Sequence, residues 1–310
     1  MDFGRSHAEV LFFAITVSFI PAVSLAMCRH RGQIIKARII LLNILVYVCV
    51  LALVNGLLSG FEYRLSGNSI LNPITLGHAA VTGLIIILYE TKALKQKMRP
   101  IVLLKVIVLL LALILANSRG PLLCLVLVAG GIYFRYGGKL TFLDLVKVSS
   151  VLFILVGLMG LYDNPFKYLV GRLTVDFGDG GEGGEARVFL WLHSYQLILS
   201  SPFFGSQTTT IFGYPHNLVL EILMSVGLIG FLMFSYVLAS TQRNIRKISK
   251  IDPDVAWIFP ILSQHFIGSL FSGAVYSSNL FWYSLGVSIA VASLHSRSPA
   301  VCKGNALWKK

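Results

Sequence analysis

The chain has 310 residues, of which 56% are hydrophobic and 13% are charged. This composition excludes an ordinary soluble protein, and apolar runs of membrane-helix length recur along the whole chain. The formal net charge of +13 does not indicate nucleic-acid binding, because the basic residues lie in short segments between the apolar runs and no nucleic-acid-binding motif accompanies them. The sequence therefore predicts a polytopic membrane protein with a single membrane-embedded domain over residues 1–310.

The apolar runs predict an all-α fold, a transmembrane helical bundle of about nine spans. The first run is longer than the h-region of a signal peptide, and basic residues follow it instead of preceding it, so we expect a retained helix. In chain order, the predicted spans are 8–27, 39–58, 75–89, 101–117, 120–134, 144–162, 217–239, 255–273 and 279–294.

The distribution of lysine and arginine predicts the orientation of these spans. One set of alternate connecting segments carries most of the basic residues, which places that set in the cytoplasm by the positive-inside rule. The amino terminus is then outside the cell membrane, the carboxyl terminus is cytoplasmic, and a large loop over residues 163–216 faces the periplasm or cell exterior. Of the 26 lysines and arginines, the outer segments hold Arg5, Arg64, Arg119, Lys167, Arg172 and Arg187.

Arg119 lies in a predicted tight turn between two spans. Gly120 and Pro121 suit such a reversal, and Pro121 fits the first turn of the following helix. The turn would hold a guanidinium group at the outer end of the bundle, where it can bind an anionic substrate. The alternative is an interfacial anchor that reaches lipid headgroups.

The large loop contains a predicted amphipathic helix over residues 185–199, which Pro202 follows. We expect this helix to lie along the membrane surface, with Trp191 at headgroup level, or to have a purely structural role there. Helical spacing puts Arg187, Trp191 and Ser194 on one face and Val188, Leu192, Tyr195 and Leu199 on another. Arginine forms bidentate hydrogen bonds with phosphate oxygens, so Arg187 and the loop residue Arg172 are candidate diphosphate ligands.

His216 and Asn217 stand where the loop ends and the next apolar helix begins. Histidine can accept a proton near neutral pH, so His216 is a candidate general base toward a sugar hydroxyl; its alternative role is a helix cap. Glu221 shares a helix face with Asn217 and lies about one turn inside the membrane boundary. Such a buried acid usually faces a bundle interior or a wet cavity, or forms a hydrogen bond between helices.

The remaining motifs do not indicate a catalytic or binding site. Asp252 and Asp254 form a D-x-D pattern, but in a short cytoplasmic segment, where we expect them to cap the following helix. The sequence has no nucleotide-binding loop, serine-hydrolase elbow or H-E-x-x-H motif, and we expect neither a cofactor nor a metal site.

Taken together, these segments resemble the O-antigen ligase and O-antigen polymerase superfamily of bacterial envelope glycosyltransferases. The matching pieces follow the family's order. They are the S-R-G sequence at 118–120, Arg187 ahead of Trp191 in a large outer loop, the S-P-F-F-G sequence at 201–205, and the His-Asn…Gly helix at 215–230.

The resemblance implies an inverting, metal-independent glycosyl transfer in the bacterial inner membrane, from a glycan on undecaprenyl pyrophosphate. By position, Arg119 and Arg187 would hold the pyrophosphate, and His216 would activate or orient the acceptor hydroxyl. Arg172 is a third candidate, and Arg64 is the candidate for a basic residue that some members carry in an earlier outer loop. Trp191, Asn217 and Glu221 complete the predicted substrate-binding residues.

Three functions remain open. A polymerase would add lipid-linked repeat units to a growing surface glycan, with a chain-length regulator as a candidate protein partner, and a ligase would transfer the finished glycan to lipid A core. We favour the polymerase. A transporter or flippase would instead need ionisable residues near the bilayer midplane and repeated halves, whereas the polar residues here gather at the outer face.

Overall fold

The computed structural model describes residues 12–28, 30–59, 65, 72–137 and 182–296, and for residues 182–187 it describes the backbone alone. Within these ranges the chain consists of helices and their connections, with an isolated bridge between Thr210 and Gly213 and no strand. The predicted all-α fold is therefore confirmed. The predicted span 144–162 and the first part of the predicted outer loop, up to residue 181, lie outside the described residues.

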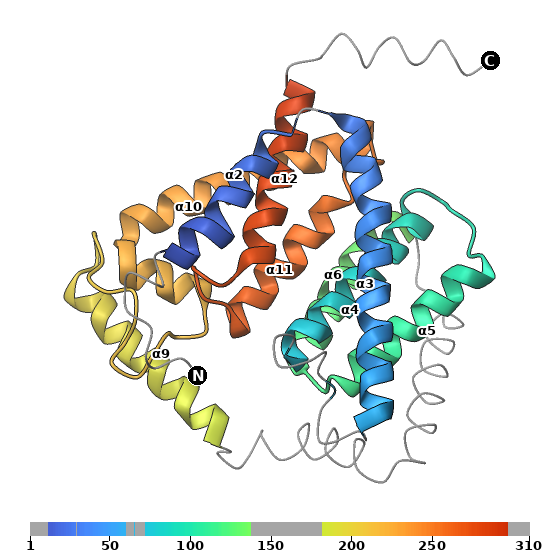
Figure 1. Cartoon of the computed structure of the whole chain (residues 1–310). Coiled ribbons are helices and arrows are strands. Elements are labelled where there is room, and N and C mark those ends of the chain that lie inside the picture. The colour runs from blue at the N-terminus through green and yellow to red at the C-terminus, as the bar shows by residue number, and fades with distance from the viewer. Residues whose placement is uncertain (1–11, 29, 60–64, 66–71, 138–181, 297–310) are drawn as a thin grey trace. The chain divides into compact units, whose positions relative to one another are not determined.

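Helices overlap each predicted span that falls within the described residues (Figure 1). Three of them, α3, α4 and α10, are long and apolar enough to cross a membrane, and several shorter apolar helices accompany them. The predicted total of about nine crossings stays a prediction. The helices are η1 (Ala14–Phe19, a π-helical segment), α2 (Ile20–Ala26), α3 (Arg31–Ser59), α4 (Pro73–Lys92), α5 (Pro100–Leu115), α6 (Arg119–Ile132), η2 (Tyr133–Gly137, also π-helical), α9 (Glu182–Ser200), α10 (Leu218–Ile251), α11 (Ile258–Ser272) and α12 (Asn279–Ser296).

The chain forms two compact units. The terminal unit comprises Met1–Arg38 and Phe189–Lys310, and the central unit comprises Ile39–Val188. Helices α3 and α9 each contribute residues to both units. The prediction of one membrane-embedded domain stays a prediction.

Several helices begin at residues that the sequence marks as helix starts. Asn72 precedes α4, and its side chain accepts a hydrogen bond from the backbone N–H of Thr75 (2.9 Å), while Pro73 occupies the first helical position. Helix α10 begins in the same manner, because the Asn217 side chain accepts from the N–H groups of Val219 and Leu220. These caps satisfy backbone donors that have no partner within the helix.

In the terminal unit, α12 packs against α2, α10 and α11. Helices α10, α11 and α12 form a hydrophobic core, against which partly buried aromatic residues such as Phe234, Phe266 and Trp282 pack. The core side chains are Leu218, Ile222, Leu238, Leu262, Phe281 and Leu285. In the central unit, α4 packs against α5 and α6, and most of its side chains are buried.

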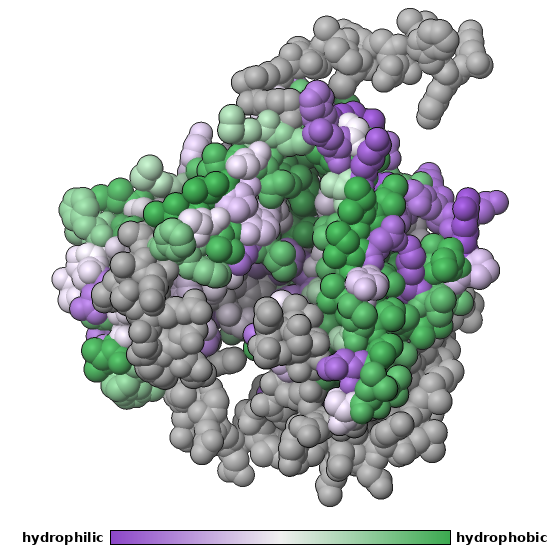
Figure 2. Space-filling model, viewed as in Figure 1, coloured by the Kyte–Doolittle hydropathy of each residue, from purple (hydrophilic) through white to green (hydrophobic). Residues whose placement is uncertain are grey.

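Helix α3 exposes large apolar side chains at many positions along its length, and Figure 2 shows much of this surface as hydrophobic. Soluble proteins rarely expose apolar surface over so long a helix, so this face is built for contact with lipid. Its exposed apolar side chains include Ile39, Ile40, Ile44, Tyr47, Val50, Leu51, Val54, Leu57 and Leu58.

Candidate functional site

The predicted base, His216, lies in a short turn that leads directly into α10. Its backbone adopts a φ of 53°, in the left-handed region that residues other than glycine seldom occupy. On one side of it, Trp191 of α9 donates a hydrogen bond from Nε1 to the carbonyl oxygen of Pro215 (2.8 Å). On the other side, Asn217 caps α10. The backbone of His216 is thus held from both neighbouring residues.

Asn217 and Trp191, both predicted to bind substrate, therefore have identified structural partners. Asn217 Oδ1 lies 3.0 Å from the amide nitrogen of Val219 and 3.1 Å from that of Leu220. The helix-capping role that was the alternative for His216 belongs to its neighbour Asn217, which leaves the imidazole outside the cap.

The ring of Tyr214 packs beside the imidazole of His216, with 4.2 Å between the ring centroids and 48° between the ring planes. The same tyrosine meets Tyr276 edge to face, with 5.9 Å between centroids. Tyr276 belongs to residues 273–278, the connection between α11 and α12. Tyr214, His216 and Tyr276 are all partly exposed.

The predicted site residue Glu221 is buried, with 3% of its surface exposed. One oxygen of its carboxylate accepts a hydrogen bond from the backbone N–H of Val275, 2.9 Å away. Glu221 therefore forms a hydrogen bond, as in the alternative considered for it, but the partner is the connection between α11 and α12 and not another helix.

The S-P-F-F-G segment at 201–205 docks into a break in α10. At Gly227 the helix departs from helical geometry, with φ 64° and ψ −166°. The N–H of Leu228 then donates to the carbonyl of Pro202 (2.8 Å), and the carbonyl of Met224 accepts from the N–H of Ser206 (2.8 Å). The segment thus provides partners for backbone groups that the break releases, as burial in an apolar environment requires.

Glycine is required on both sides of this junction. A Cβ atom on Gly227 would lie 2.3 Å from the carbonyl carbon of Phe203, and one on Gly205 would lie 2.4 Å from that of Ser225. Both glycines also have positive φ, 64° and 72°. Gly227 therefore permits the close approach of the S-P-F-F-G backbone to α10.

The two faces predicted for α9 differ in burial at the residues whose side chains are described. Ser194 is fully buried and Trp191 contacts the His216 turn, whereas the side chains of the opposite face are exposed. The exposed residues are Val188, Leu192, Tyr195 and Leu199. The position of α9 along a membrane surface stays a prediction.

Arg119 is the first residue of α6, and Pro121 lies in the first turn, as predicted. Ser118 precedes the helix with extended backbone geometry and makes no side-chain capping hydrogen bond. The start of α6 packs closely on α4, since a Cβ on Gly77 would lie 2.9 Å from the ring of Pro121. Arg119 itself is partly buried.

Arg119 belongs to the central unit and His216 to the terminal unit, so the predicted convergence of the two stays a prediction. Arg64, Arg172 and the side chain of Arg187 lie outside the described residues. Their roles as pyrophosphate ligands stay predictions as well.

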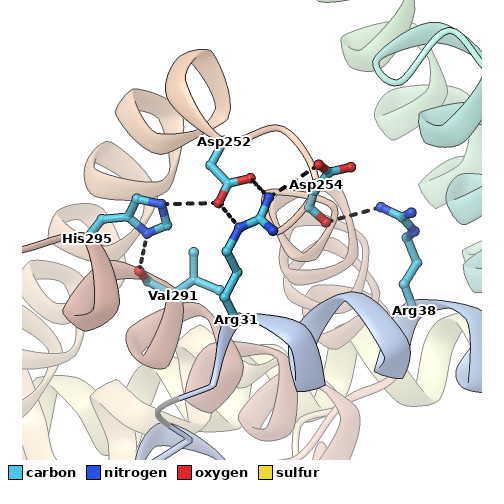
Figure 3. Close-up of polar contacts among 6 residues, drawn as sticks. All are labelled: Arg31, Arg38, Asp252, Asp254, Val291 and His295. Atoms are coloured by element: carbon cyan, nitrogen blue, oxygen red, sulfur yellow. Dashed lines mark hydrogen bonds and ion pairs between the residues drawn. The ribbon is translucent and has the colours of Figure 1, made fainter. Parts of the chain in front are cut away.

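A second polar cluster lies at the opposite end of α10 (Figure 3). Arg31 donates to both oxygens of Asp252, from Nε at 2.6 Å and from Nη2 at 2.7 Å, and His295 Nε2 lies 3.4 Å from the same carboxylate. Arg38 donates to the backbone carbonyl of Asp254 (3.1 Å). These contacts tie the start of α3 to the ends of α10 and α12.

The helix-capping role predicted for Asp252 and Asp254 is wrong. Helix α11 begins after Trp257, with no side-chain cap, and Arg31 takes up the carboxylates instead. Burial alone would raise the pKa of Asp252, but the hydrogen bonds and positive charge of Arg31, with a smaller contribution from His295, outweigh burial and hold it below its usual value. Within the described part of the chain, no three His, Cys, Asp or Glu residues are placed to hold a metal ion.

Sequence reasoning missed Tyr214 and the connection at 273–278, which meets the His216 turn from a distant part of the sequence. It also missed the break in α10. The two glycines at 205 and 227 were a signal for the break, because each stands inside or beside an apolar helix where glycine is unfavourable.

Comparison with known proteins agrees with the resemblance found in the sequence. Residues 104–235 match the family model described as O-Antigen ligase. No curated protein matches the chain. With its apolar helices, the chain is an integral membrane protein. The matched segment contains Arg119, Arg187 and His216, so all three lie in the part of the chain that is similar to this family.

Proposed function

We propose that the protein is a surface-polysaccharide polymerase that transfers undecaprenyl-pyrophosphate-linked repeat units onto a growing glycan at the periplasmic face of the inner membrane. The family match supports an O-antigen ligase or polymerase type of role. The observation that carries the proposal is the His216 turn, where a left-handed histidine is held between Trp191 and Asn217 while its imidazole stays outside the helix cap.

In the proposed reaction, His216 accepts the proton of the acceptor hydroxyl, and the hydroxyl oxygen attacks the anomeric carbon of the donor sugar. The bond from that carbon to the phosphate oxygen breaks, and undecaprenyl pyrophosphate leaves with the electron pair. Attack from the side opposite the leaving group inverts the anomeric centre. A positioned general base of this kind contributes roughly 10²–10⁴-fold to the rate.

Arg119 is the proposed ligand of the leaving pyrophosphate. It occupies the first position of α6, where the helix dipole disfavours a cation but favours an anion. A bound diphosphate would offset this unfavourable interaction between Arg119 and the helix dipole, because its oxygens would interact with both the guanidinium group and the N-terminal N–H groups. Arg187 and Arg172 are proposed as further ligands, and the reaction requires no metal because arginines neutralise the leaving group.

A ligase that transfers the glycan to lipid A core is the second candidate, because the matching family model is described as O-Antigen ligase and supports either role. Both enzymes share the donor chemistry and differ in the acceptor. Localisation in the inner membrane, with the amino terminus outside and the carboxyl terminus cytoplasmic, is part of the proposal.

The test is to delete the gene, restore it as wild type, Arg119→Ala or His216→Ala, and separate the envelope polysaccharide on a gel. The polymerase predicts a band of one repeat unit in the deletion strain and in both variants, with full-length chains restored by wild type. Lipid-linked polymer beside bare core would instead identify a ligase. Repeat units that accumulate on the inner leaflet would identify a transporter and contradict the enzymatic account.

A further inference from the structure

We propose that Tyr276, in the connection between α11 and α12, binds a pyranose ring of the lipid-linked glycan beside His216, and that Glu221 is the positioning residue that holds this connection. The inference rests on the proposed function and extends its site beyond residues 104–235, where the family match ends. The contacts that support the inference come from the connection itself and from α10, α12 and η1.

The backbone of residues 275 and 276 is fixed by side chains from three helices. Glu221 of α10 accepts from the N–H of Val275 (2.9 Å), and Trp282 of α12 donates from Nε1 to the carbonyl oxygen of Val275 (2.7 Å). Ser18 of η1 donates to the carbonyl oxygen of Tyr276 (2.6 Å). These three hydrogen bonds fix the position of the connection relative to α10, α12 and η1.

The side chain of Tyr276 extends the aromatic surface beside His216. Its ring meets Tyr214 edge to face at 5.9 Å and Phe13 at 6.4 Å, and Tyr214 in turn packs on the imidazole at 4.2 Å. Tyr276 remains partly exposed, although its backbone carbonyl accepts a hydrogen bond from Ser18. A rigid backbone that presents a partly exposed aromatic ring is typical of a binding residue on a scaffolded loop.

A sugar suits this surface. The faces of a pyranose ring carry C–H groups with a small positive charge, which pack on the negative face of an aromatic ring, and the tyrosine hydroxyl adds hydrogen bonding at the edge. Because Tyr214 packs on the proposed base and Tyr276 packs on Tyr214, a sugar bound along these two rings would bring a hydroxyl group within reach of His216. The proposed orientation of the spans places residues 273–278 on the same outer side as His216.

Glu221 acts through this connection. Its carboxylate is buried and contacts a backbone N–H, so its effect on substrate passes through the position of Tyr276. Glutamine keeps an acceptor oxygen at this position, whereas alanine leaves the N–H of Val275 without this partner.

The first experiment measures the affinity of the full-length protein in nanodiscs for two probes: undecaprenyl pyrophosphate, and the lipid-linked repeat unit isolated from the gene-deletion strain. Wild type should bind the second probe more tightly. Tyr276→Leu should lower that affinity about tenfold, which corresponds to about 1.4 kcal/mol, and leave undecaprenyl pyrophosphate binding unchanged. Tyr276→Phe, which keeps the ring, should stay within about threefold of wild type.

Two results would overturn the inference while leaving the proposed function intact: Tyr276→Leu binding both probes like wild type, or Tyr276→Phe losing as much affinity as the leucine variant. Wild type that binds neither probe would overturn the proposed function and this inference with it. The free oligosaccharide, which lacks the lipid pyrophosphate, serves as a competitor in polymer formation and distinguishes donor from acceptor. If it inhibits wild type but not Tyr276→Leu, the glycan bound by Tyr276 is the acceptor.

The second experiment tests Glu221 by steady-state kinetics of polymer formation. Glu221→Ala should raise KM for the lipid-linked unit as Tyr276→Leu does, with a smaller effect on kcat, and Glu221→Gln should restore wild-type KM. The double variant Glu221→Ala/Tyr276→Leu should be no worse than either single change, because the two act on one contact. Loss of activity in Glu221→Gln equal to that in Glu221→Ala would show a direct role of the carboxylate and overturn its assignment as a positioning residue.

Discussion

The indole nitrogen of Trp191 donates a hydrogen bond to the carbonyl oxygen of Pro215, 2.8 Å away, and so ties α9 to the turn that carries His216. Trp191, which was predicted to bind substrate, thus holds the backbone of the residue that precedes the proposed base. A change in the position of α9 would therefore change the position of His216.

Trp191→Phe removes this hydrogen bond and keeps an aromatic ring. We expect the transfer rate to fall about tenfold, because His216 is less firmly positioned, while stability falls by about 1 kcal/mol. Initial rates and thermal unfolding of the purified protein measure the two effects.

The matched control is Trp257→Phe, which removes an indole hydrogen bond to the carbonyl oxygen of Ile34, near the opposite end of α10. It should cost similar stability and leave the rate unchanged. Equal loss of rate in both variants would mean that Trp191 contributes to stability alone.

Gly227→Ala tests the junction between α10 and the S-P-F-F-G segment. The new methyl group would lie 2.3 Å from the carbonyl carbon of Phe203, at a φ of 64° that alanine adopts with strain. We expect a loss of at least 1–3 kcal/mol in stability, roughly the cost of the backbone strain alone. Gly130→Ala in α6, where no atom lies within 4 Å of the new Cβ, should be neutral or stabilising, and thermal unfolding in detergent compares the two.

How far the sequence could predict this structure depends on the distance between interacting residues. Hydropathy located the helices, and the turn that carries Arg119 is a local feature that sequence patterns record. The helix cap that was considered for His216 belongs instead to Asn217. The contact of Tyr214 with Tyr276 joins residues 62 positions apart, and the hydrogen bond from Val275 to Glu221 joins residues 54 positions apart. No periodicity signals such contacts. The ion pair of Arg31 with Asp252 is missed for the same reason, because local rules favour a helix cap for an aspartate before a helix.

The ion pair between Asp252 and Arg31 predicts a dependence of stability on pH. Because the folded-state pKa of Asp252 lies below its unfolded value, of about 3.9, its stabilising contribution is present above that value and is lost as the pH falls through the folded-state pKa. Arg31 is half exposed, so we expect about 0.5–1 kcal/mol. The stability difference between wild type and Asp252→Asn, measured by thermal unfolding, should be present at neutral pH and shrink as the pH falls through the folded-state pKa of Asp252; a difference that does not depend on pH would contradict this assignment.

The orientation of the terminal unit can be measured by cysteine labelling in whole cells. Ser277→Cys, exposed beside the proposed sugar site, should react with a membrane-impermeant maleimide, whereas Lys247→Cys, exposed near the other end of α10, should react only after permeabilisation. The reverse pattern would place His216 on the cytoplasmic side and contradict the proposed site. The background for both variants replaces Cys28, Cys49, Cys124 and Cys302 with alanine.

The most direct test of the proposed mechanism is polymer formation by the purified protein in liposomes with radiolabelled lipid-linked repeat units. His216→Asn is the sharpest variant, because asparagine tolerates the left-handed backbone of this position but cannot act as a general base. We predict that it binds the lipid-linked unit like wild type and forms polymer at least about 100-fold more slowly. Polymer formation by His216→Asn at the wild-type rate would contradict the account.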